Sequence, residues 1–246
     1  MSVPWWRLAE RPEGVETDLV IVGGGIAGLS ALRRSAELGV ASMLLERGRV
    51  CDGASGRNAG YLMRGAADSY AAACDSIGRE AARTLWRTSE RNLDRLLGWG
   101  AGETRGFARR ASCLLAASEA EASLLTASVE MLREDGFAVD VFEPDAAGDV
   151  LGDRLRRGLV GCLSEGGGVG LINPGDAVCS PVEVVRRVAA PVRRRVREGE
   201  GVVSIEREGD GVRVRSAGLV VTARAALVCT NAWAGELLPE LRGRVV

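Results

Sequence analysis

The sequence predicts an α/β protein, and three observations near its start carry that prediction. A short apolar run, Asp18 to Val22, has the length of one buried strand. The next segment has apolar residues at helical spacing, and a glycine-rich turn joins it to the run. A second apolar run, Ser42 to Glu46, follows closely. Strand, helix and strand over about 30 residues form a βαβ unit, whose two strands lie parallel.

The helix of this unit is expected over Ile26 to Leu38. Ile26, Leu29 and Leu32 fall on one side of it, and charged residues fall on the other. Gly39 stands just after the last helical residue, where helices commonly end in a left-handed conformation that glycine adopts easily. The single apolar side predicts that this helix packs against the sheet.

The middle of the chain has a weaker pattern. A long glycine-rich loop is expected over residues 48–65, and a helix is expected around Arg79 to Leu97. Ser118 and Glu121 form a capping box, which predicts a helix start. The other elements expected here are strands at 111–117 and 138–142 and a helix from 118 to 135. Residues 144–174 are rich in glycine and predict no clear element.

The last third begins with another helix signal. Ser180 suits the N-cap and Pro181 the first helical position, and Pro191 is expected to end or kink the helix. Strands are expected at 192–197, 202–206, 211–216, 219–224 and 225–230. The middle three form an antiparallel meander at the side of the sheet, and the last is a buried strand of parallel type. The expected fold is a parallel sheet with a side meander, plus an inserted α+β region.

Composition limits the chemistry that this chain can perform. It has 246 residues, 46% of them hydrophobic, which is enough for one sizeable core. All 32 basic residues are arginine, and there is no histidine. A Ser-His-Asp triad, a zinc site with histidine and a lysine Schiff base are therefore excluded for this chain. The sequence assigns no catalytic residue and no metal site.

Charge and cysteine content indicate the surroundings of the protein. The formal net charge of -1 gives no overall field that would attract nucleic acid or an anionic membrane. Six cysteines are scattered without a C-x-x-C pair, which is typical of reduced thiols. The apolar runs have the length of strands, not of membrane spans. We therefore expect a cytoplasmic protein with no membrane span and no nucleic-acid partner.

The glycine-rich turn after the first strand has the spacing of a dinucleotide-binding motif. Gly23, Gly25 and Gly28 form G-x-G-x-x-G between a strand and a helix. The first glycine allows a tight turn, the second lets a pyrophosphate approach the backbone, and the third lets helix and strand pack closely. The N-terminus of the helix attracts the phosphates. Glu46, at the end of the second strand, is placed to bind ribose hydroxyls, and its charge disfavours NADP.

A second glycine-rich stretch, Gly53 to Gly60, makes the cofactor more specific. With the first motif it resembles the D-amino-acid-oxidase-like family of FAD oxidoreductases, which includes glycine and sarcosine oxidases and gamma-glutamylputrescine oxidase. Residues 196–205 resemble the family's strand-turn-strand that meets the adenine, which places that contact at Val202. Residues 227–233 resemble its strand and turn on the cofactor side. The resemblance runs, with gaps, from residue 16 to the end.

The resemblance implies that FAD is the cofactor. Together with the motif glycines, the residues assigned to FAD are Gly23, Gly25, Ile26, Ala27, Gly28, Glu46, Arg47, Ala54, Ser55, Arg57, Asn58, Ala59, Gly60, Tyr61, Val202, Thr230 and Trp233. Tyr61 and Arg64 follow the second glycine-rich stretch, where they either face a substrate carboxylate or pack within the loop. Packing is the favoured role, because loop residues more often pack than bind.

The resemblance also predicts the domain organisation. The FAD-binding domain is expected in two parts, 1–100 and 175–235, with a portion of the substrate domain, 101–174, inserted between them. Residues 236–246 are expected to begin a return to the substrate domain. Family members continue with the rest of the substrate-domain sheet, so we expect a C-terminally truncated chain or one that a partner chain completes.

The function implied is oxidation of the C–N bond of an amine or amino acid, with hydride transfer to the flavin. The expected partner is therefore a small-molecule amine or amino acid. Three alternatives stay open: another FAD enzyme, such as a monooxygenase or a tRNA-modifying oxidase; a flavin-binding chain without catalysis of its own; and an NAD-dependent dehydrogenase, which would exchange its cofactor with free NAD.

Overall fold

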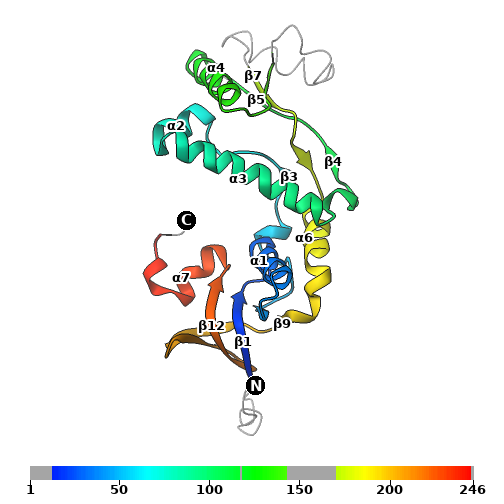
Figure 1. Cartoon of the computed structure of the whole chain (residues 1–246), viewed down its shortest axis with the longest axis vertical. Helices are drawn as coiled ribbons and strands as arrows, with labels where there is room; N and C mark the ends of the chain where they lie inside the picture. Colours follow the sequence, from blue (N-terminus) through cyan, green and yellow to red (C-terminus); the bar gives the residue numbers. More distant parts are fainter. Residues whose placement is uncertain (1–12, 117, 143–169, 245–246) are drawn as a thin grey trace, which may run out of the picture. The chain divides into compact units, whose positions relative to one another are not determined.

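The computed structural model describes residues 13–116, 118–142 and 170–244. The chain divides into two compact units, shown in sequence colours in Figure 1. The first unit comprises residues 1–59 and 181–246, and the second comprises residues 60–180. The first unit is thus built from two separate stretches of the chain.

The boundaries of these units differ from the expected boundaries at residues 100 and 175. The difference arises because α3 (Arg79–Gly98), expected at the end of the first domain part, shares a core with α2 (Tyr70–Ile77) and α4 (Glu119–Glu134). Trp86 of α3 lies in the same buried cluster as Tyr70 of α2. The assignment of the two units to cofactor and substrate stays a prediction.

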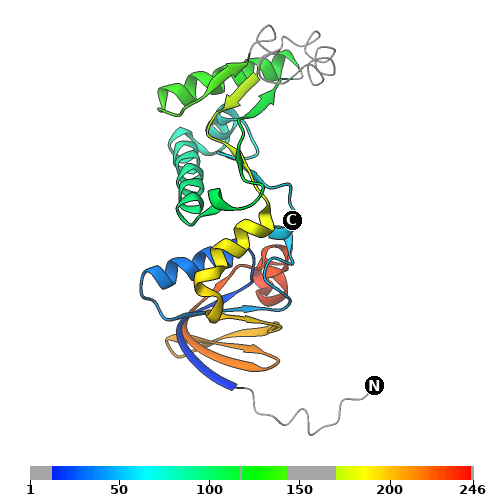
Figure 2. The same cartoon turned by 90° about the vertical axis from the view of Figure 1, so that its right-hand side faces the viewer.

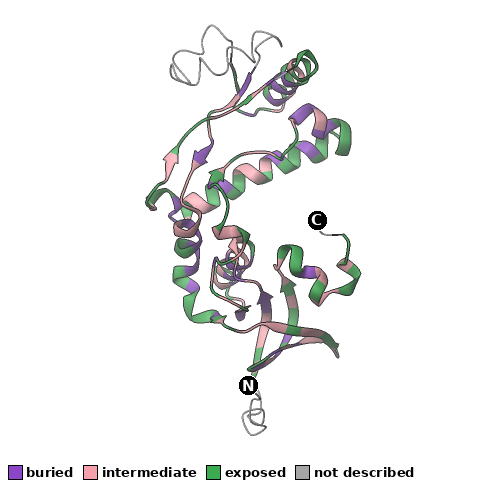
Figure 3. Cartoon of the chain, turned by 180° about the vertical axis from the view of Figure 1, so that it is seen from behind, coloured by how far each residue is buried: buried purple, intermediate pink, exposed green. Residues whose placement is uncertain are grey.

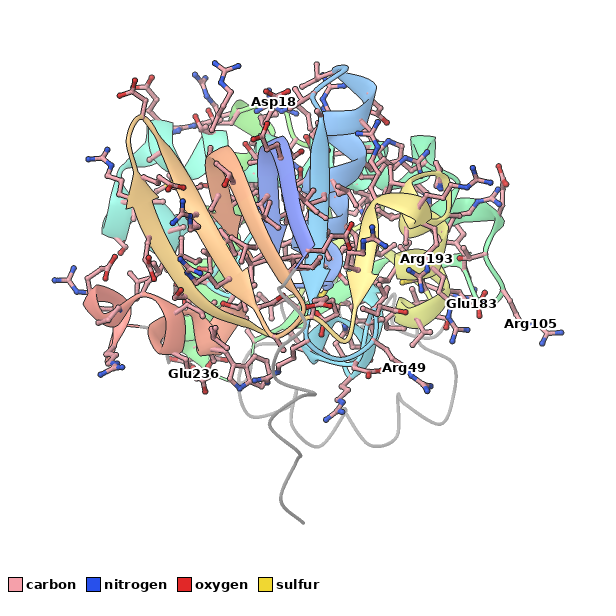
Figure 4. All side chains as sticks on the ribbon, turned by 90° about the horizontal axis from the view of Figure 1, so that it is seen from below. Asp18, Arg49, Arg105, Glu183, Arg193 and Glu236 are labelled. Atoms are coloured by element: carbon pink, nitrogen blue, oxygen red, sulfur yellow. The ribbon has the colours of Figure 1, made fainter. Side chains whose placement is uncertain are left out.

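The first unit is built on one six-stranded sheet. Its strands are β1 (Glu13–Val22), β2 (Ser42–Glu46), β9 (Val196–Glu198), β10 (Val202–Glu208), β11 (Gly211–Ser216) and β12 (Leu219–Val228). The order is β10-β11-β12-β1-β2-β9, and Figure 4 shows these strands from below. The pairs β12-β1, β1-β2 and β2-β9 are parallel. A parallel sheet within an α/β fold is therefore confirmed.

The meander expected at the side of the parallel sheet is continuous with it. The strands expected at 219–224 and 225–230 are one continuous strand, β12, which has no turn residue between its halves. It pairs in parallel with β1 along its whole length and antiparallel with β11 over its first part. Val214 of the meander shares a buried cluster with Val20 and Val22 of β1. The meander residues therefore cover one face of the parallel strands.

Helices cover the other face of the parallel strands. They are α1 (Ile26–Glu37) and α6 (Pro181–Ala189), which contact each other and lie side by side in Figure 2. Ile21 and Leu44 are fully buried, and Leu44 lies next to Gly28 of α1. The strands thus carry apolar side chains on both faces, as parallel strands do. The burial of the last residues of β1 is visible in Figure 3.

The strand expected at 192–197 is wrong. The 3-10 helix η5 (Ala190–Arg195) continues from α6, and only Val196–Glu198 forms a strand, β9. Pro191 suits the start of a helical turn because its φ is fixed near the helical value. Val192 is buried although it lies in this helical turn. The apolar residue that suggested an alternating strand is therefore one that packs from a helix.

The second unit is an α+β arrangement. Its strands are β3 (Tyr61–Leu62), β4 (Ala108–Arg109), β5 (Ser112–Leu115), β6 (Asp140–Phe142), β7 (Gly170–Asn173) and β8 (Ala177–Val178). They form two sheets, with orders β3-β8-β4 and β5-β7-β6. The helix α2 and the short strands at 61, 108, 170 and 177 carried no pattern in the sequence.

An aromatic cluster forms the core of this unit. The ring of Tyr70 lies 4.9 Å from that of Trp86 and 5.9 Å from that of Phe137, both edge to face. The predicted helix start at Ser118 is confirmed, since its side chain caps α4 and accepts a hydrogen bond of 3.2 Å from the Glu121 amide. In the described parts of the chain, no helix has the length and apolar character that crossing a bilayer requires.

Candidate dinucleotide-binding site

The turn between β1 and α1 can be built only with glycine. Gly23 has φ +112, and a Cβ there would lie 2.5 Å from the carbonyl oxygen of Cys229. A Cβ on Gly28 would overlap the carbonyl oxygen of Gly23. A Cβ on Gly25 would lie 2.9 Å from Ser55 Oγ. The three glycines therefore let the strand, the helix and the loop at Ser55 approach one another closely.

The N-terminus of α1 opens toward this turn. Gly25 is the N-cap and has no side chain to cap the helix, and the first helical amide, Ile26 N–H, donates to Ser55 Oγ at 2.9 Å. Ser55 belongs to the short 3-10 helix η2 (Ala54–Gly56). Free amides and the positive end of the helix dipole favour an anion at this place.

Glu46 ends β2 and ties the turn to the following loop. Its Oε2 accepts from the Gly24 amide at 2.6 Å, and its Oε1 accepts from the Gly48 amide at 2.7 Å. Each carboxylate oxygen has two lone pairs, so both keep capacity for a ligand hydroxyl. The acid expected to bind ribose therefore also holds the protein backbone around the site.

The loop after β2 is fixed from two sides. The Cys51 amide donates to the Gly24 carbonyl at 3.1 Å, and Cys51 itself has a left-handed φ of 74. The Val50 amide donates to Glu198 Oε1 of β9 at 2.7 Å. That bond is the main cause that holds the pKa of Glu198 below its ordinary value, and Arg193 adds to it. Burial raises the pKa of the Cys51 thiol above its ordinary value.

Residues after β9 and β12 form the remaining wall of a cavity of about 670 Å³. This volume lies within the range of small-molecule sites. Every residue that lines the cavity belongs to the first unit. On its rim, the Arg47 guanidinium lies 4.8 Å from the ring centre of Trp233 and 3.9 Å from the Glu236 carboxylate. The cavity therefore combines a glycine-rich wall, carboxylates and a cation stacked on an aromatic ring.

The structure brings ten of the expected FAD residues to this cavity. They are Gly23, Gly25, Glu46, Arg47, Ala54, Ser55, Arg57, Val202, Thr230 and Trp233. Five others of the same unit do not line it: Ile26, Ala27, Gly28, Asn58 and Ala59. Gly60 and Tyr61 belong to the second unit.

Sequence reasoning missed twelve residues that line the cavity. They are Val22, Gly24, Leu45, Gly48, Cys51, Asp52, Gly53, Glu200, Cys229, Asn231, Glu236 and Leu237. Most are chain neighbours of predicted residues, so the motifs already gave a signal for them. Glu200 lies within residues 196–205, the stretch whose resemblance placed the adenine contact at Val202. Glu236 had no signal, because only the fold brings it to this place.

Polar groups of the cavity fit a nucleotide ligand. Thr230 Oγ1 is buried and has no hydrogen-bond partner among the described residues. Buried polar atoms normally have a partner, so this hydroxyl is available to a ligand. The helix N-terminus suits a pyrophosphate, and the Glu46 carboxylate suits ribose hydroxyls. A dinucleotide such as FAD therefore fits the chemistry of these residues.

The second unit holds Arg64 in an internal network. Arg64 Nη1 donates to Glu90 at 2.8 Å, its backbone amide donates to Asp176 at 3.1 Å, and its side chain is only 9% exposed. Tyr61, in contrast, is 67% exposed. Packing within the unit, the favoured role for Arg64, agrees with these contacts.

Comparison with known proteins identifies the family. The family described as FAD dependent oxidoreductase matches residues 18–246. Glycine oxidase from Bacillus licheniformis is 29% identical over 238 residues, which are 91% of this chain and 56% of that protein. The tRNA 5-methylaminomethyl-2-thiouridine biosynthesis bifunctional protein MnmC from Burkholderia thailandensis is 29% identical over 243 residues, 93% of this chain and 34% of that protein.

The fold has solved counterparts. The crystal structure of glycine oxidase from Geobacillus kaustophilus aligns with a TM-score of 0.69 at 21% identity, covering 93% of this chain and 59% of that chain. The chain spans between about a third and somewhat over half of the length of these proteins. The match over residues 18–246, together with the glycine turn and Glu46, leads to one conclusion: this chain belongs to the family of FAD-dependent oxidoreductases.

Proposed function

We propose that the chain binds FAD in this cavity and serves an oxidase or dehydrogenase that oxidises the C–N bond of an amine or amino acid. The observation that carries the proposal is the glycine turn at the N-terminus of α1, with Glu46 and Ser55 beside it and a cavity of about 670 Å³ in front of it. Membership of an FAD-dependent family supports the choice of dinucleotide.

Each part of the cofactor has a proposed place. The pyrophosphate is proposed to lie against the backbone of Gly23 and Gly25 and the first turn of α1. There the Ala27 amide would donate to it, and the Ile26 amide, which donates to Ser55 Oγ, would lie beside it. Glu46 accepts hydrogen bonds from the ribose hydroxyls. Val202 meets the adenine. Ala54 and Ser55, which also line the cavity, are proposed to contact the cofactor beyond the pyrophosphate.

The outer positions complete the proposed site. Arg47 and Trp233 cover its rim, where they stack on each other. Arg57 lines the cavity and supplies a second positive charge near the phosphates. Thr230 offers the free hydroxyl. Asn58, Ala59, Gly60 and Tyr61 do not line the cavity, and their contact with FAD stays a prediction.

The substrate class rests on the relatives. Glycine oxidase is named for an amino acid, and it matches 91% of this chain. Bound FAD would supply the electron acceptor for a hydride from the carbon next to the amine. The chain's own residues bind and orient the cofactor, and none is assigned to proton transfer. This agrees with the absence of histidine and lysine, because a hydride route from a neutral amine needs no strong protein base.

The first test is an absorbance spectrum of the purified chain, followed by titration with FAD. Flavin bands, or uptake of FAD with the variant Glu46→Gln binding more weakly, support the proposal. Glu206→Gln serves as the matched control, because Glu206 is exposed on β10 and does not line the cavity. A folded chain that takes up no FAD, or that exchanges it for NAD, contradicts the cofactor assignment.

The second candidate substrate is a nucleoside in tRNA. The relative from Burkholderia thailandensis, named for tRNA 5-methylaminomethyl-2-thiouridine biosynthesis, is as similar to this chain as glycine oxidase is. Anaerobic flavin reduction separates the two: free amines and amino acids reduce the flavin under the first proposal, and tRNA reduces it under the second. Reduction by neither class favours a flavin-binding chain that needs further polypeptide for catalysis.

A further inference from the structure

A second carboxylate, which was not among the expected FAD residues, lines the cavity. Glu200 lies in the connection between β9 and β10, and its amide donates to the Glu46 carbonyl at 2.9 Å. The backbone bond fixes Glu200 at the end of β2, beside the acid expected to bind ribose. The two acids therefore belong to one wall.

The Glu200 side chain is held by one of its two oxygens. Its Oε2 accepts from the Ser216 hydroxyl at 2.5 Å and from the Gly218 amide at 3.3 Å. Its Oε1 has no hydrogen-bond donor among the residues that the structure describes. The carboxylate is thus oriented by the protein and retains one free acceptor oxygen.

Gly218 is required for this arrangement. A Cβ at position 218 would lie 2.8 Å from Glu200 Oε1, closer than real Cβ contacts come. Gly218 has no left-handed φ, so alanine is compatible with its backbone. An added methyl group would therefore push the carboxylate aside and leave its charge in place.

The position of Glu200 relates it to the base of the nucleotide. Val202, the proposed adenine contact, is two residues further along the chain and pairs across the sheet with Ser216, which anchors the Glu200 carboxylate. Ribose is already assigned to Glu46 at the end of β2. The Glu200 carboxylate therefore belongs to the part of the cavity wall that is proposed to meet the base.

A carboxylate that meets the base favours one class of purine. An ionised carboxylate only accepts hydrogen bonds. Adenine carries an exocyclic amine at carbon 6, which donates. Hypoxanthine and guanine carry a carbonyl oxygen there, which repels a carboxylate, and they donate from N1, one ring position away. A carboxylate that the protein holds opposite carbon 6 therefore prefers adenine. A hydrogen bond to a charged group carries enough free energy to discriminate between the two.

We propose that Glu200 is a specificity-determining residue that selects a 6-amino purine over a 6-oxo purine in the bound flavin dinucleotide. This rests on the proposed function, because it assumes that the cavity holds the adenosine half of FAD. The residue acts by contact with the base and leaves the flavin chemistry unchanged.

The test compares FAD with flavin hypoxanthine dinucleotide, which differs only at carbon 6 of the purine. Dissociation constants are measured by flavin fluorescence for the unaltered chain, Glu200→Gln, Gly218→Ala and the control Glu206→Gln. The unaltered chain and Glu206→Gln should bind FAD roughly 10- to 100-fold more tightly than the analogue. Glu200→Gln should lose most of that preference, because an amide can also donate, and Gly218→Ala should lose it with the charge retained.

The outcomes separate this proposal from the one it rests on. Equal affinity of the unaltered chain for both dinucleotides overturns the role of Glu200 and leaves FAD binding intact. The role of Glu200 is also overturned if both Glu200→Gln and Gly218→Ala, with folding verified by circular dichroism, still prefer FAD over the analogue. That result assigns the discrimination to the Val202 backbone. Failure to bind either dinucleotide overturns the proposed function itself.

Discussion

Thr230 follows β12 and places a hydroxyl in the cavity wall without a protein partner. The turn there is unusual, since the next residue, Asn231, has a left-handed φ of 51. A buried hydroxyl without a hydrogen bond destabilises the folded chain, whereas a methyl group of the same size does not. We therefore expect the Thr230 hydroxyl to strengthen ligand binding and to lower the stability of the cofactor-free chain.

Replacing Thr230 by valine should have opposite effects on stability and on binding. The free energy of unfolding of the cofactor-free chain should stay equal or rise by about 1 kcal/mol, and the dissociation constant for FAD should increase roughly five- to tenfold. Denaturant unfolding and FAD titration measure the two quantities. Thr230→Ser retains the hydroxyl and should bind FAD as the unaltered chain does. Equal affinity of all three would show that the hydroxyl makes no bond to the cofactor.

Gly28 illustrates a residue whose role is steric. A Cβ at this position would overlap the Gly23 carbonyl oxygen, a backbone atom that cannot move without opening the turn. Gly28→Ala should therefore lower the free energy of unfolding by about 1–3 kcal/mol, as overpacking does. Gly14→Ala is the control, because a Cβ on Gly14 meets nothing within 4 Å. Similar urea midpoints for the two variants would contradict the proposed close approach.

At the scale of elements, Glu198 connects β9 with the loop that follows β2. The Val50 amide and then Arg193 lower the pKa of its carboxyl group, while burial opposes them. The group is more acidic in the folded chain than in the unfolded chain. Its charge therefore stabilises the fold above the ordinary glutamate pKa, and this contribution is lost as the pH falls through the lower folded value.

The variant Glu198→Gln tests this connection. The unaltered chain should be more stable than the variant at pH 7, and the difference should shrink as the pH falls below about 4.5, because the unaltered side chain then becomes neutral as well. Urea unfolding from pH 7 to pH 3 gives the difference at each pH. A gap that does not change with pH would assign the effect to shape instead of charge.

At the scale of the whole molecule, the cavity depends on one compact unit that two chain segments build. Every cavity-lining residue lies in residues 1–59 or 181–246. The chain leaves this unit after Ala59 and returns at Pro181, and the Cys179 amide donates to the Gly60 carbonyl at 2.8 Å. The points of exit and return are therefore close together.

A shortened chain in which a brief glycine-serine linker replaces residues 60–180 should fold and bind ADP about as tightly as the whole chain does. The linker has only a short distance to span. All residues that line the cavity are retained. Cooperative thermal unfolding and isothermal titration with ADP measure the two properties. Loss of folding would show that the first unit needs the second for stability, and folding without ADP binding would move the nucleotide site elsewhere.

Much of the fold was predictable where local patterns act alone. The strand at 42–46 has the predicted bounds, the helix predicted over 26–38 ends one residue earlier, and the cap at Ser118 is in place. These elements depend on periodicity and on capping groups within a few residues, which the sequence displays directly. The prediction of a strand at 192–197 was wrong, because an alternating pattern beside Pro191 fits a helical turn as well as a strand.

Long-range pairing was not predictable in the same way. The sequence showed the two halves of β12, but only pairing with both β1 and β11 makes them one strand. Likewise, Glu200 reaches the cavity because β9 pairs with β2, a partner more than 150 residues earlier in the chain. Such contacts leave no signal within a short window of residues.

The sequence by itself determined the βαβ unit, the glycine turn, the acid at Glu46 and, through resemblance, the family that the comparisons confirm. The glycine turn depends on short-range sterics, since a side chain at position 23 or 28 would overlap backbone atoms. The tertiary structure alone decided that the meander joins the main sheet, that the units divide at 59/60 and 180/181, and that Glu236 lines the cavity. The physical reason is that strand pairing and burial join residues far apart in the chain, and no local pattern records which partner they find.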